Sequence, residues 1–391
     1  MPDLTKRVAC HARAFAPDAI RMRRDLHRHP ELAWTERRTT YRLAEALKEQ
    51  DLKPEIRPDG IGLLVEVGSG SPIIGFRADI DALPIQEETG APYRSQVDGL
   101  MHACGHDAHA AIAVGIARTL AALGDLPGTA RFLFQPAEED IPSGAAQLVQ
   151  EGAHHGLDAL FAYHVDPTIP AGSVGLRVGP ITSAADKIHV RLTGPGGHTS
   201  RPDRTVDLIN VAARVVTDLP ARISADLGPD RHLTLVFGRI AGGAAANAIP
   251  ALVEISGTAR VRTVAVWRGL PDLIERQLKE IAATYGAGVE LDYRRGSPPV
   301  DNDGHVIGVI RQVATDVLGS NGVRPTPQSM GSEDFSWYLE DVPGALVRLG
   351  VGQTDHPVDV HSPTFDLDEA AIEHGIVVGA LSLLRLMEQP R

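Results

Sequence analysis

The order of expected helices and strands constrains the fold of this chain more than any other feature. Up to about residue 182, amphipathic helical patterns alternate with short apolar runs that are typical of strands. The expected helices are 21–30, 35–50 and 108–123, and the expected strands are 61–67, 73–80, 130–135 and 158–165. We interpret 61–67 and 73–80 as two strands joined by a turn. The alternation predicts an α/β domain in which helices cover a central mixed sheet.

The pattern changes near Ser183. Strands are expected at 187–193, 231–240 and 252–262, and helices at 205–219 and 268–284. These elements fit the β-α-β-β-α-β order, which predicts an inserted α+β domain, a ferredoxin-like sandwich. Long helices resume at 305–318 and 367–388. We therefore expect one domain made of residues 1–182 and 299–391, and an inserted domain of residues 183–298.

Composition supports this organisation and excludes some classes of protein. A chain of 391 residues is long enough for two domains, and 43% hydrophobic with 23% charged residues is typical of a folded protein. The formal charge of −12 argues against a general nucleic-acid partner. Cys10 and Cys104 do not form a disulfide framework, and we found no signal segment or membrane-length apolar run. A cytoplasmic protein with no membrane association is expected.

The densest cluster of chemically active residues is His102-Ala-Cys-Gly-His-Asp-Ala-His109. Imidazole nitrogen and thiolate sulfur suit borderline-soft divalent ions. Cys104 and His106 can converge on one ion only where the backbone is irregular, which Gly105 permits. A polar loop with a buried cysteine is the alternative, but so many ligand types within eight positions favour a metal site.

A second candidate is the run Phe132-Leu-Phe-Gln-Pro-Ala-Glu138-Glu139, where an apolar strand ends in adjacent carboxylates. Neighbouring residues point in different directions, so one carboxylate can bind metal while the other takes a proton from water. A solvated acidic turn explains the segment equally well when it is taken alone.

Two further histidines are weak signals by themselves. His164 lies near the end of an apolar strand, where a histidine is more often part of the core, and His361 lies in a loop before the last helix. Together with the earlier residues they make a ligand set rich enough for two ions. That set is Cys104, His106, Glu139, His164 and His361.

The inserted domain contributes candidates of another kind. His198, in a glycine-rich turn, can polarise a carbonyl group, and Asn247 can donate a neutral hydrogen bond. Arg260 can bind a carboxylate with its planar guanidinium group. His198 and Arg260 also have ordinary explanations, a tight turn with an incidental histidine and a surface arginine in a strand.

With these residues laid out, the chain resembles the M20 family of metallopeptidases. It is most similar to the amidohydrolase branch that includes hippurate hydrolase, N-acyl-amino-acid aminoacylases and plant indole-acetyl-amino-acid hydrolases. The matching motifs span nearly the whole chain in the family's order. They are Arg24–Leu32, Arg77–Ile85, His102–Asp107, Gln135–Glu139, Gly196–Ser200, Asn247–Pro250, Gly331–Phe335 and His361–Pro363.

The resemblance implies a catalytic domain that binds two divalent ions, and an inserted domain that serves as lid and dimer surface. It implies the ligands Cys104, His106, Glu139, His164 and His361. It also implies Glu138 as general base and His198 as the group that stabilises the oxyanion, either in its own subunit or in that of the partner. A homodimer or higher homo-oligomer is expected to form through the inserted domain.

The sequence departs from the broader family at two places. A His-x-Asp motif that supplies a ligand in relatives reads Arg77-Ala-Asp79 here, so Asp79 and Asp81 are expected to orient the ligands instead. Cys104 stands where many relatives have a bridging Asp. A thiolate favours zinc, manganese, cobalt or nickel over magnesium.

The hypothesis is hydrolysis of an N-acyl amino acid. Glu138 deprotonates the attacking water, His198 holds the developing oxyanion, and Asn247 and Arg260 bind the substrate carboxylate. One alternative is a deacetylase of N-acetyl-diaminopimelate type or a carbamoyl-amide hydrolase of the same fold. Another is a non-catalytic metal-binding protein, which the presence of a base beside Glu139 disfavours.

Overall fold

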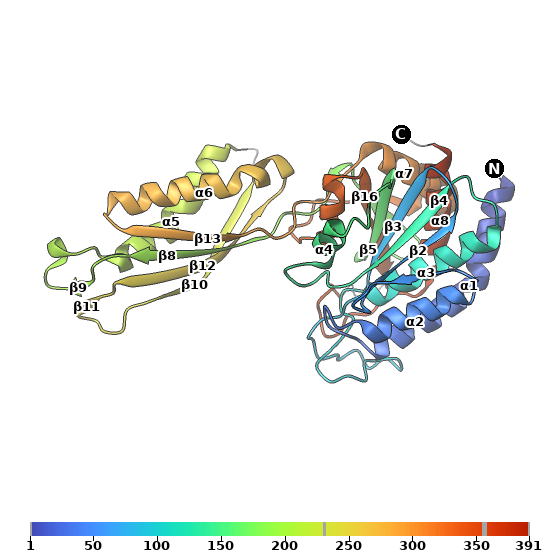
Figure 1. Cartoon of the computed structure of the whole chain (residues 1–391), viewed down its shortest axis with the longest axis horizontal. Helices are drawn as coiled ribbons and strands as arrows, with labels where there is room; N and C mark the ends of the chain where they lie inside the picture. The colour runs from blue at the N-terminus through green and yellow to red at the C-terminus, as the bar shows by residue number, and fades with distance from the viewer. Residues whose placement is uncertain (1, 230–231, 354–357, 390–391) are drawn as a thin grey trace. The chain divides into compact units, whose positions relative to one another are not determined.

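Two compact units make up the computed structural model, which describes residues 2–229, 232–353 and 358–389 (Figure 1). The first unit comprises Met1–Ile181, Asn302–Pro327 and Trp337–Arg391. The second comprises Thr182–Asp301 and Gln328–Ser336. The short segment Gln328–Ser336 thus packs with the second unit, whereas sequence patterns alone assign it to the first domain.

An eight-stranded mixed sheet forms the centre of the first unit, with the strand order β1-β2-β4-β3-β5-β16-β6-β15. The strands are β1 (Glu55–Ile56), β2 (Leu63–Gly68), β3 (Ile73–Asp79), β4 (Thr129–Gln135), β5 (Ala159–Pro170), β6 (Val174–Leu176), β15 (Val323–Pro325) and β16 (Gly344–Gly352). The helices are α1 (Pro2–Arg28), α2 (Arg37–Lys48), α3 (His106–Leu123), α4 (Gly144–Gln150), α7 (Gly304–Leu318), α8 (Ala370–Glu388) and the short η2 (Ser320–Gly322). The expected α/β class is confirmed.

The main core lies between this sheet and the helices α1, α3, α7 and α8. Along β4, Phe132 and Phe134 belong to that core, whereas the intervening Leu133 is buried outside it, toward the opposite face. Side chains alternate between the two faces of a strand, so both faces of β4 are covered. A strand buried on both faces reads as a continuous apolar run, as 130–135 does.

Two details of the first unit differ from the sequence expectations. The strands β2 and β3 do not form a hairpin, because β4 lies between them, antiparallel to β2 and parallel to β3. Helix α1 begins at Pro2, far before the expected start at residue 21. Its buried stripe includes Val8, Ala12 and Ala19, spaced as on one face of a helix.

The second unit contains a four-stranded antiparallel sheet of order β10-β12-β8-β13. Its main elements are β8 (Asp186–Thr193), α5 (Leu208–Leu227), β10 (Leu233–Gly242), β12 (Leu252–Val261), α6 (Val264–Thr284) and β13 (Gly288–Arg294). Its minor elements are β9 (Gly197–His198), η1 (Pro202–Arg204) and β11 (Ala248–Ile249). Three more short elements lie near the positions where the chain passes from one unit to the other. They are β7 (Gly179–Pro180), β14 (Asp301–Asn302) and η3 (Asp334–Glu340). Helices α5 and α6 pack together on the sheet (Figure 1). The β-α-β-β-α-β order and this strand order define a ferredoxin-like sandwich.

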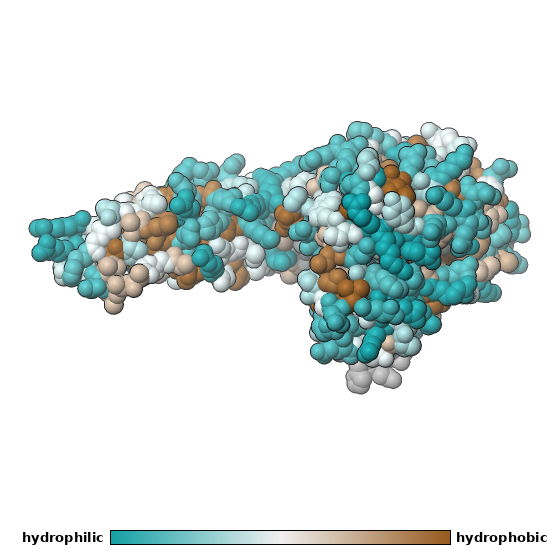
Figure 2. All heavy atoms as spheres, turned by 60° about the horizontal axis from the view of Figure 1, so that its bottom comes forward, coloured by the Kyte–Doolittle hydropathy of each residue, from teal (hydrophilic) through white to brown (hydrophobic). Residues whose placement is uncertain are grey.

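Helix α8 is long and apolar enough to cross a membrane by length and composition, contrary to the expectation that no such segment exists. Within the protein, however, 78% of its apolar window is buried. The helix packs against α1, α3 and α7 as part of the main core. Figure 2 shows hydrophilic side chains over most of the face that it draws, with apolar ones in small separate groups. Burial in the core therefore explains the hydropathy of α8.

Candidate active site

Neighbouring parallel strands bring several candidate residues to one edge of the large sheet. The ends of β3 and β4 lie side by side, since Asp79 pairs with Gln135 in a parallel register. Strand β5, which carries His164, runs parallel to β3 on the other side. The carboxyl ends of parallel strands form the usual ligand-binding edge of an α/β sheet. The chain continues from β4 directly into Glu138 and Glu139.

A left-handed glycine allows two neighbouring candidates to point inward together. Gly105 precedes helix α3 and has a φ of 78°, a conformation that glycine adopts without steric cost. A Cβ atom at this position would lie 2.6 Å from Val165 Cγ2. Cys104 and His106, on either side of Gly105, are both buried. The irregular backbone expected from the sequence is present.

Four of the five expected ligands place their donor atoms close together. Cys104 Sγ lies 3.3 Å from His361 Nε2 and 3.5 Å from His164 Nε2. His361 Nε2 lies 3.0 Å from Glu139 Oε1. Donor atoms of Cys104, Glu139 and His361 all lie within 4.8 Å of one another, and so do those of His106, Glu138 and Glu139. These two overlapping groups have the composition of a metal centre.

The fifth expected ligand, His106, has a ring nitrogen at the same place, Nε2, which lies 3.7 Å from Asp79 Oδ2. Its Nδ1 lies 2.9 Å from the backbone oxygen of Asp81, so Nδ1 carries the proton and donates it. Nε2 is buried and has no hydrogen-bond partner among the residues that the structure describes. An imidazole whose far nitrogen donates to a carbonyl is the usual arrangement of a metal-ligating histidine.

The protonation states of this cluster are those that a cation would change. Burial raises the pKa of the Cys104 thiol to about 12 and lowers the pKa of His164 well below its usual value. Burial alone would also lower the pKa of His106, but Asp79, Cys104 and Asp81 together outweigh burial and raise that pKa. A bound divalent ion favours thiolate and neutral imidazole. The donor set therefore fits soft divalent ions. Without such an ion, burial disfavours the thiolate of Cys104.

Asp81 holds the turn that follows β4. Its two carboxylate oxygens accept the backbone N–H groups of Glu138 and Glu139, each at 3.0 Å. Because its backbone oxygen also binds His106, Asp81 fixes three of the candidate residues at once. The residue before Glu138, Ala137, is buried and has a positive φ of 53°. Such rare backbone conformations concentrate at functional sites.

Asp79 and His109 form a buried pair beside this centre. His109 Nδ1 lies 2.6 Å from Asp79 Oδ1, and its Nε2 accepts the N–H of Val165 at 2.9 Å. Both ring nitrogens are thus engaged, so His109 has no lone pair for an ion although it belongs to a group of suitable composition. The pair supports the strand residue next to His164. Arg77 also contacts Asp79 and donates to Gln135 at 2.8 Å.

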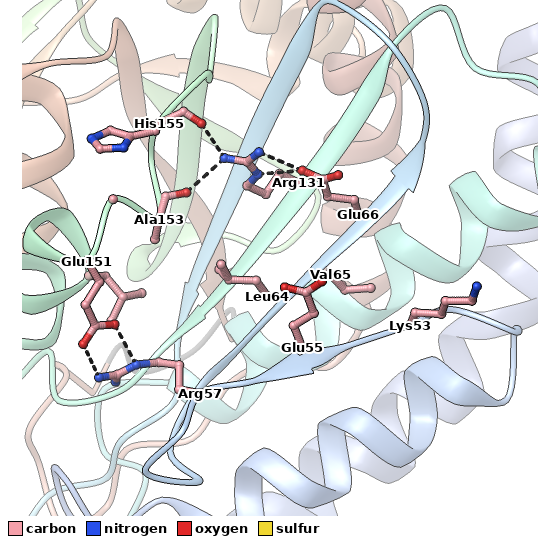
Figure 3. A pocket seen from close by; sticks show the side chains of 12 residues that line it. Lys53, Glu55, Arg57, Leu64, Val65, Glu66, Arg131, Glu151, Ala153 and His155 are labelled. Atoms are coloured by element: carbon pink, nitrogen blue, oxygen red, sulfur yellow. Dashed lines mark hydrogen bonds and ion pairs between the residues drawn. The ribbon is translucent and has the colours of Figure 1, made fainter.

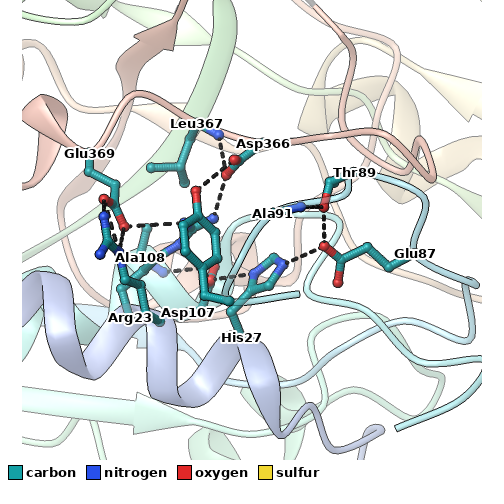
Figure 4. Close-up of polar contacts among 12 residues, drawn as sticks. Arg23, His27, Glu87, Thr89, Ala91, Asp107, Ala108, Asp366, Leu367 and Glu369 are labelled. Atoms are coloured by element: carbon teal, nitrogen blue, oxygen red, sulfur yellow. Dashed lines mark hydrogen bonds and ion pairs between the residues drawn. The ribbon is translucent and has the colours of Figure 1, made fainter. Parts of the chain in front are cut away.

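A network of charged groups surrounds Asp107, the residue that follows His106 (Figure 4). Asp107 accepts hydrogen bonds from Arg23 and His27, each at 2.8 Å. Arg23 also reaches Asp366 and Glu369, which follow the loop of His361. The carboxylate of Asp107 is thus bound by two side chains of α1. His102 is buried and uncharged, because burial lowers its pKa to about 4.

The second unit carries the remaining candidates, and two of them lie together. His198 in β9 pairs with Ala248 in β11, and the backbone oxygen of the exposed Asn247 accepts the N–H of Thr199. His198 is exposed, and its Nδ1 accepts the backbone N–H of Ser200 at 3.1 Å. The proton of the neutral imidazole therefore lies on Nε2, which can donate to an external oxygen.

Arg260 does not join them. It lies near the end of β12 opposite to Leu252, which pairs with Thr193 on the side of His198. A rise of about 3.3 Å per residue separates the two ends of this strand by about 25 Å. Arg260 donates to the backbone oxygen of Met330 at 2.7 Å. Within one chain, Arg260 and Asn247 therefore cannot bind the same small carboxylate.

A surface hollow of about 570 Å³ lies apart from all these residues (Figure 3). Its charged groups bind one another, Arg57 with Glu151 and Arg131 with Glu66. It contains none of the expected site residues. Volume alone does not make a catalytic site, and the polar groups that converge with perturbed pKa values lie at the Cys104 cluster instead.

Comparisons with known proteins identify the family. Residues 75–385 match the model of peptidase family M20/M25/M40. N-acetylcysteine deacetylase of Bacillus subtilis (strain 168) is 37% identical over 367 residues, which cover 92% of this chain and 94% of that protein. A solved Bacillus subtilis structure, described as a dinuclear metal-binding peptidase of the M20 family, matches with a TM-score of 0.85 and 34% identity. This match covers 96% of this chain and 99% of the other.

One relative is much longer than this chain. A Rhodococcus jostii (strain RHA1) protein with a glutamate–cysteine ligase name is 41% identical over 372 residues, or 95% of this chain. The match covers 47% of that protein, so this chain spans about half of its length. The ligase name belongs to the longer protein.

The chain belongs to peptidase family M20/M25/M40. The resemblance inferred from the motifs is confirmed, and so is the expectation of an enzyme, at the level of a metal-dependent amide hydrolase. The alternative of a non-catalytic metal-binding protein is not supported by these relatives. Sequence reasoning missed Glu36, whose carboxyl group contacts the turn before Glu138. The only sequence signal was its place in the first turn of the expected helix 35–50.

Proposed function

We propose that this enzyme hydrolyses the amide bond of N-acyl amino acids and holds two divalent ions, zinc, manganese, cobalt or nickel, for that reaction. The observation that carries the proposal is the convergence of the donor atoms of Cys104, Glu139 and His361 beside Glu138. His106 and His164 complete the proposed ligand set. The deacetylase name of one relative supports an N-acyl amino acid as substrate.

When bound, the ions supply Lewis-acid chemistry that polarises the acyl carbonyl and lowers the pKa of water. Glu138 takes a proton from the attacking water as the new carbon–oxygen bond forms. It then gives that proton to the amine nitrogen as the carbon–nitrogen bond breaks, so the carboxyl group returns to its starting state. Asp81 holds the backbone of Glu138 and Glu139 in register for these two tasks.

His198 stabilises the oxyanion of the tetrahedral intermediate in this proposal. Ser200 N–H occupies Nδ1 of the imidazole, which leaves the Nε2 proton to donate. Hydrogen-bond donors aimed at developing charge typically contribute about 10²–10³ in rate.

The substrate carboxylate binds Asn247 and Arg260, and the separation of these two residues supports a site shared between two chains. If one chain supplies Arg260, its partner supplies Asn247 and His198, which lie together at the other end of the inserted unit. We therefore propose a homodimer or larger oligomer formed through this unit. Cys10 and Cys104 are free thiols, which agrees with a cytoplasmic enzyme.

Replacing Glu138 by Gln tests the mechanism. The amide cannot accept the proton, so turnover of an N-acetyl amino acid should fall by at least about 10²-fold. Metal content should stay at the wild-type level, since the proposed ligands are intact. Elemental analysis and steady-state kinetics give the two readouts. Normal turnover in Glu138→Gln would overturn the assignment of the base.

A substrate panel tests the substrate class. Initial rates on N-acetyl, N-benzoyl and N-carbamoyl derivatives of one amino acid, and on N-acetyl-diaminopimelate, should favour a simple N-acyl amino acid. A preference for the carbamoyl compounds or for N-acetyl-diaminopimelate would replace this proposal with that of another amide hydrolase of the same fold.

A further inference from the structure

Glu36 is a buried carboxyl residue that its own helix does not explain. It occupies the position before helix α2, yet its side chain makes no capping hydrogen bond there. Glutamate is not among the residues preferred at this position. Its side chain is fully buried, which is costly for a carboxyl group unless a polar partner compensates. The reason for its presence must lie elsewhere in the fold.

The cap of α2 comes from a different residue. Glu31 accepts the backbone N–H groups of Arg38 and Thr39 with its two carboxylate oxygens, at 3.0 and 2.8 Å. These are donors of the first turn of the helix, which need partners outside it. Glu31 thus performs the local structural task and leaves the side chain of Glu36 to reach another segment.

That segment is the turn of the proposed general base. Glu36 Oε1 accepts the backbone N–H of Ala137 at 2.8 Å. Ala137 is buried, has a φ of 53°, and directly precedes Glu138. A residue with a side chain keeps this left-handed conformation only where its surroundings hold it.

Carboxyl oxygens therefore bind the N–H groups of three consecutive residues. Glu36 binds Ala137, and Asp81 binds Glu138 and Glu139. On the other side, the Ala137 oxygen accepts the N–H of Gly144 at 2.8 Å. Both peptide groups around the left-handed residue are thus fixed, which sets the direction in which the next side chain leaves the backbone.

We propose that Glu36 is a positioning residue that orients Glu138 for proton transfer by holding the left-handed turn at Ala137. The inference rests on the proposed role of Glu138 as general base. Glu36 itself touches neither the substrate nor the reacting atoms in this proposal.

To hold Ala137, residue 36 needs an acceptor oxygen within hydrogen-bonding distance of the Ala137 N–H rather than a negative charge. Burial, with the nearby charge of Asp81, raises the pKa of Glu36 to about 8. Its second oxygen, Oε2, is buried and has no hydrogen-bond partner among the residues that the structure describes. A neutral amide can supply the same acceptor. Aspartate keeps the carboxyl group but is shorter by one methylene, and so cannot reach Ala137 without movement of the chain.

The experiment compares Glu36→Asp, Glu36→Gln and the control Glu31→Ala. In Glu36→Asp, kcat should fall about 10–100-fold, because small displacements of a catalytic group are costly. KM and metal content should stay within about twofold of the wild type. Glu36→Gln should keep most of the wild-type kcat. Glu31→Ala should lower the melting temperature, because it removes the helix cap, but leave kcat unchanged when assayed well below that temperature.

Three outcomes would overturn the proposal. One is a Glu36→Asp enzyme with wild-type kcat, and another is a Glu36→Gln enzyme that is as slow as Glu36→Asp. The third is a loss of metal that accounts for the loss of kcat. Glu138→Gln measured alongside separates the two proposals, since an active Glu138→Gln removes the proposed base. A slow Glu138→Gln beside a fast Glu36→Asp refutes only the role of Glu36.

Discussion

At the scale of single residues, rare backbone conformations lie next to the proposed ligands and base. Gly105 separates Cys104 from His106, and Ala137 precedes Glu138. His361 itself has a φ of 63°. Residues with side chains pay a conformational cost there, which surrounding contacts must offset. The Ala103 oxygen, for example, accepts the N–H of His361 at 2.8 Å. The site is therefore built on a constrained backbone.

Replacing Gly105 by Ala should weaken metal binding as well as stability. The new methyl group would lie 2.6 Å from Val165 Cγ2 at a φ of 78°, so the chain between Cys104 and His106 must shift. Gly70, in the turn between β2 and β3, is a control with a φ of 82° and nothing within 4 Å of its Cβ position. Gly70→Ala should cost only about 1–2 kcal/mol from the positive φ.

Thermal unfolding and the metal content after dialysis measure both effects. Equal losses of stability and equal metal content in Gly105→Ala and Gly70→Ala would contradict the expectation that the contact with Val165 fixes the ligand spacing.

At the scale of elements, helix α1 is joined to the start of α3 and to the loop before α8 by buried charges (Figure 4). His27 contacts Asp107 and Glu87, while Arg23 contacts Asp107 and Asp366. Buried ion pairs do not guarantee net stability, but removal of one partner leaves the other uncompensated. The network makes the position of α3 dependent on α1.

His27 should make the stability of the protein depend on pH in the alkaline range. Burial alone would lower its pKa, but the charge and hydrogen bond of Asp107 outweigh this and raise the pKa from 6.5 to about 9. Because the folded-state pKa is raised, the contribution is fully present below pH 6.5 and is lost as the pH rises through 9. The shift corresponds to up to about 3 kcal/mol.

Urea unfolding of the wild type and His27→Gln at pH 6, 8 and 10 measures this contribution. The difference in free energy of unfolding between the two should shrink toward pH 10. His11→Gln, a less buried histidine on the same helix, serves as the control. A difference that is constant over this range would contradict a charged His27.

At the scale of the whole molecule, the proposed reaction needs groups from both units. The proposed ligands and base belong to the first unit, and His198 and Asn247 belong to the second. Arg260 also belongs to the second unit, but lies at the far end of β12 from Asn247. A site that uses both Arg260 and Asn247 can be completed by two chains of an oligomer.

Mixing two inactive variants tests this sharing. Equal amounts of His198→Ala and Glu138→Gln, allowed to exchange subunits, form dimers in which one site has both an intact Glu138 and an intact His198. About one quarter of the wild-type activity should return. The control replaces Glu138→Gln by the double variant Glu138→Gln/His198→Ala, which restores no site. No recovery in spite of demonstrated subunit exchange would refute the sharing.

Local patterns were sufficient for most elements and for choosing the candidate site residues. The apolar run 130–135 became β4, and the order β-α-β-β-α-β became the inserted sandwich. The cluster from His102 to His109 already contained the unusual pairing of Cys104 with His106 around a glycine. Such features depend on residue type and short spacing, which the chain carries wherever it folds.

Long-range pairing decided the rest. Nothing local in β2 or β3 indicates that β4 lies between them, because strand order depends on packing across the whole sheet. The carboxyl group of Glu36 meets Ala137 across 101 positions of sequence. By itself the sequence determined the family, the elements and the candidate ligands. Only the tertiary structure decided which buried groups hold the turn of Glu138, because those contacts join segments that no local pattern connects.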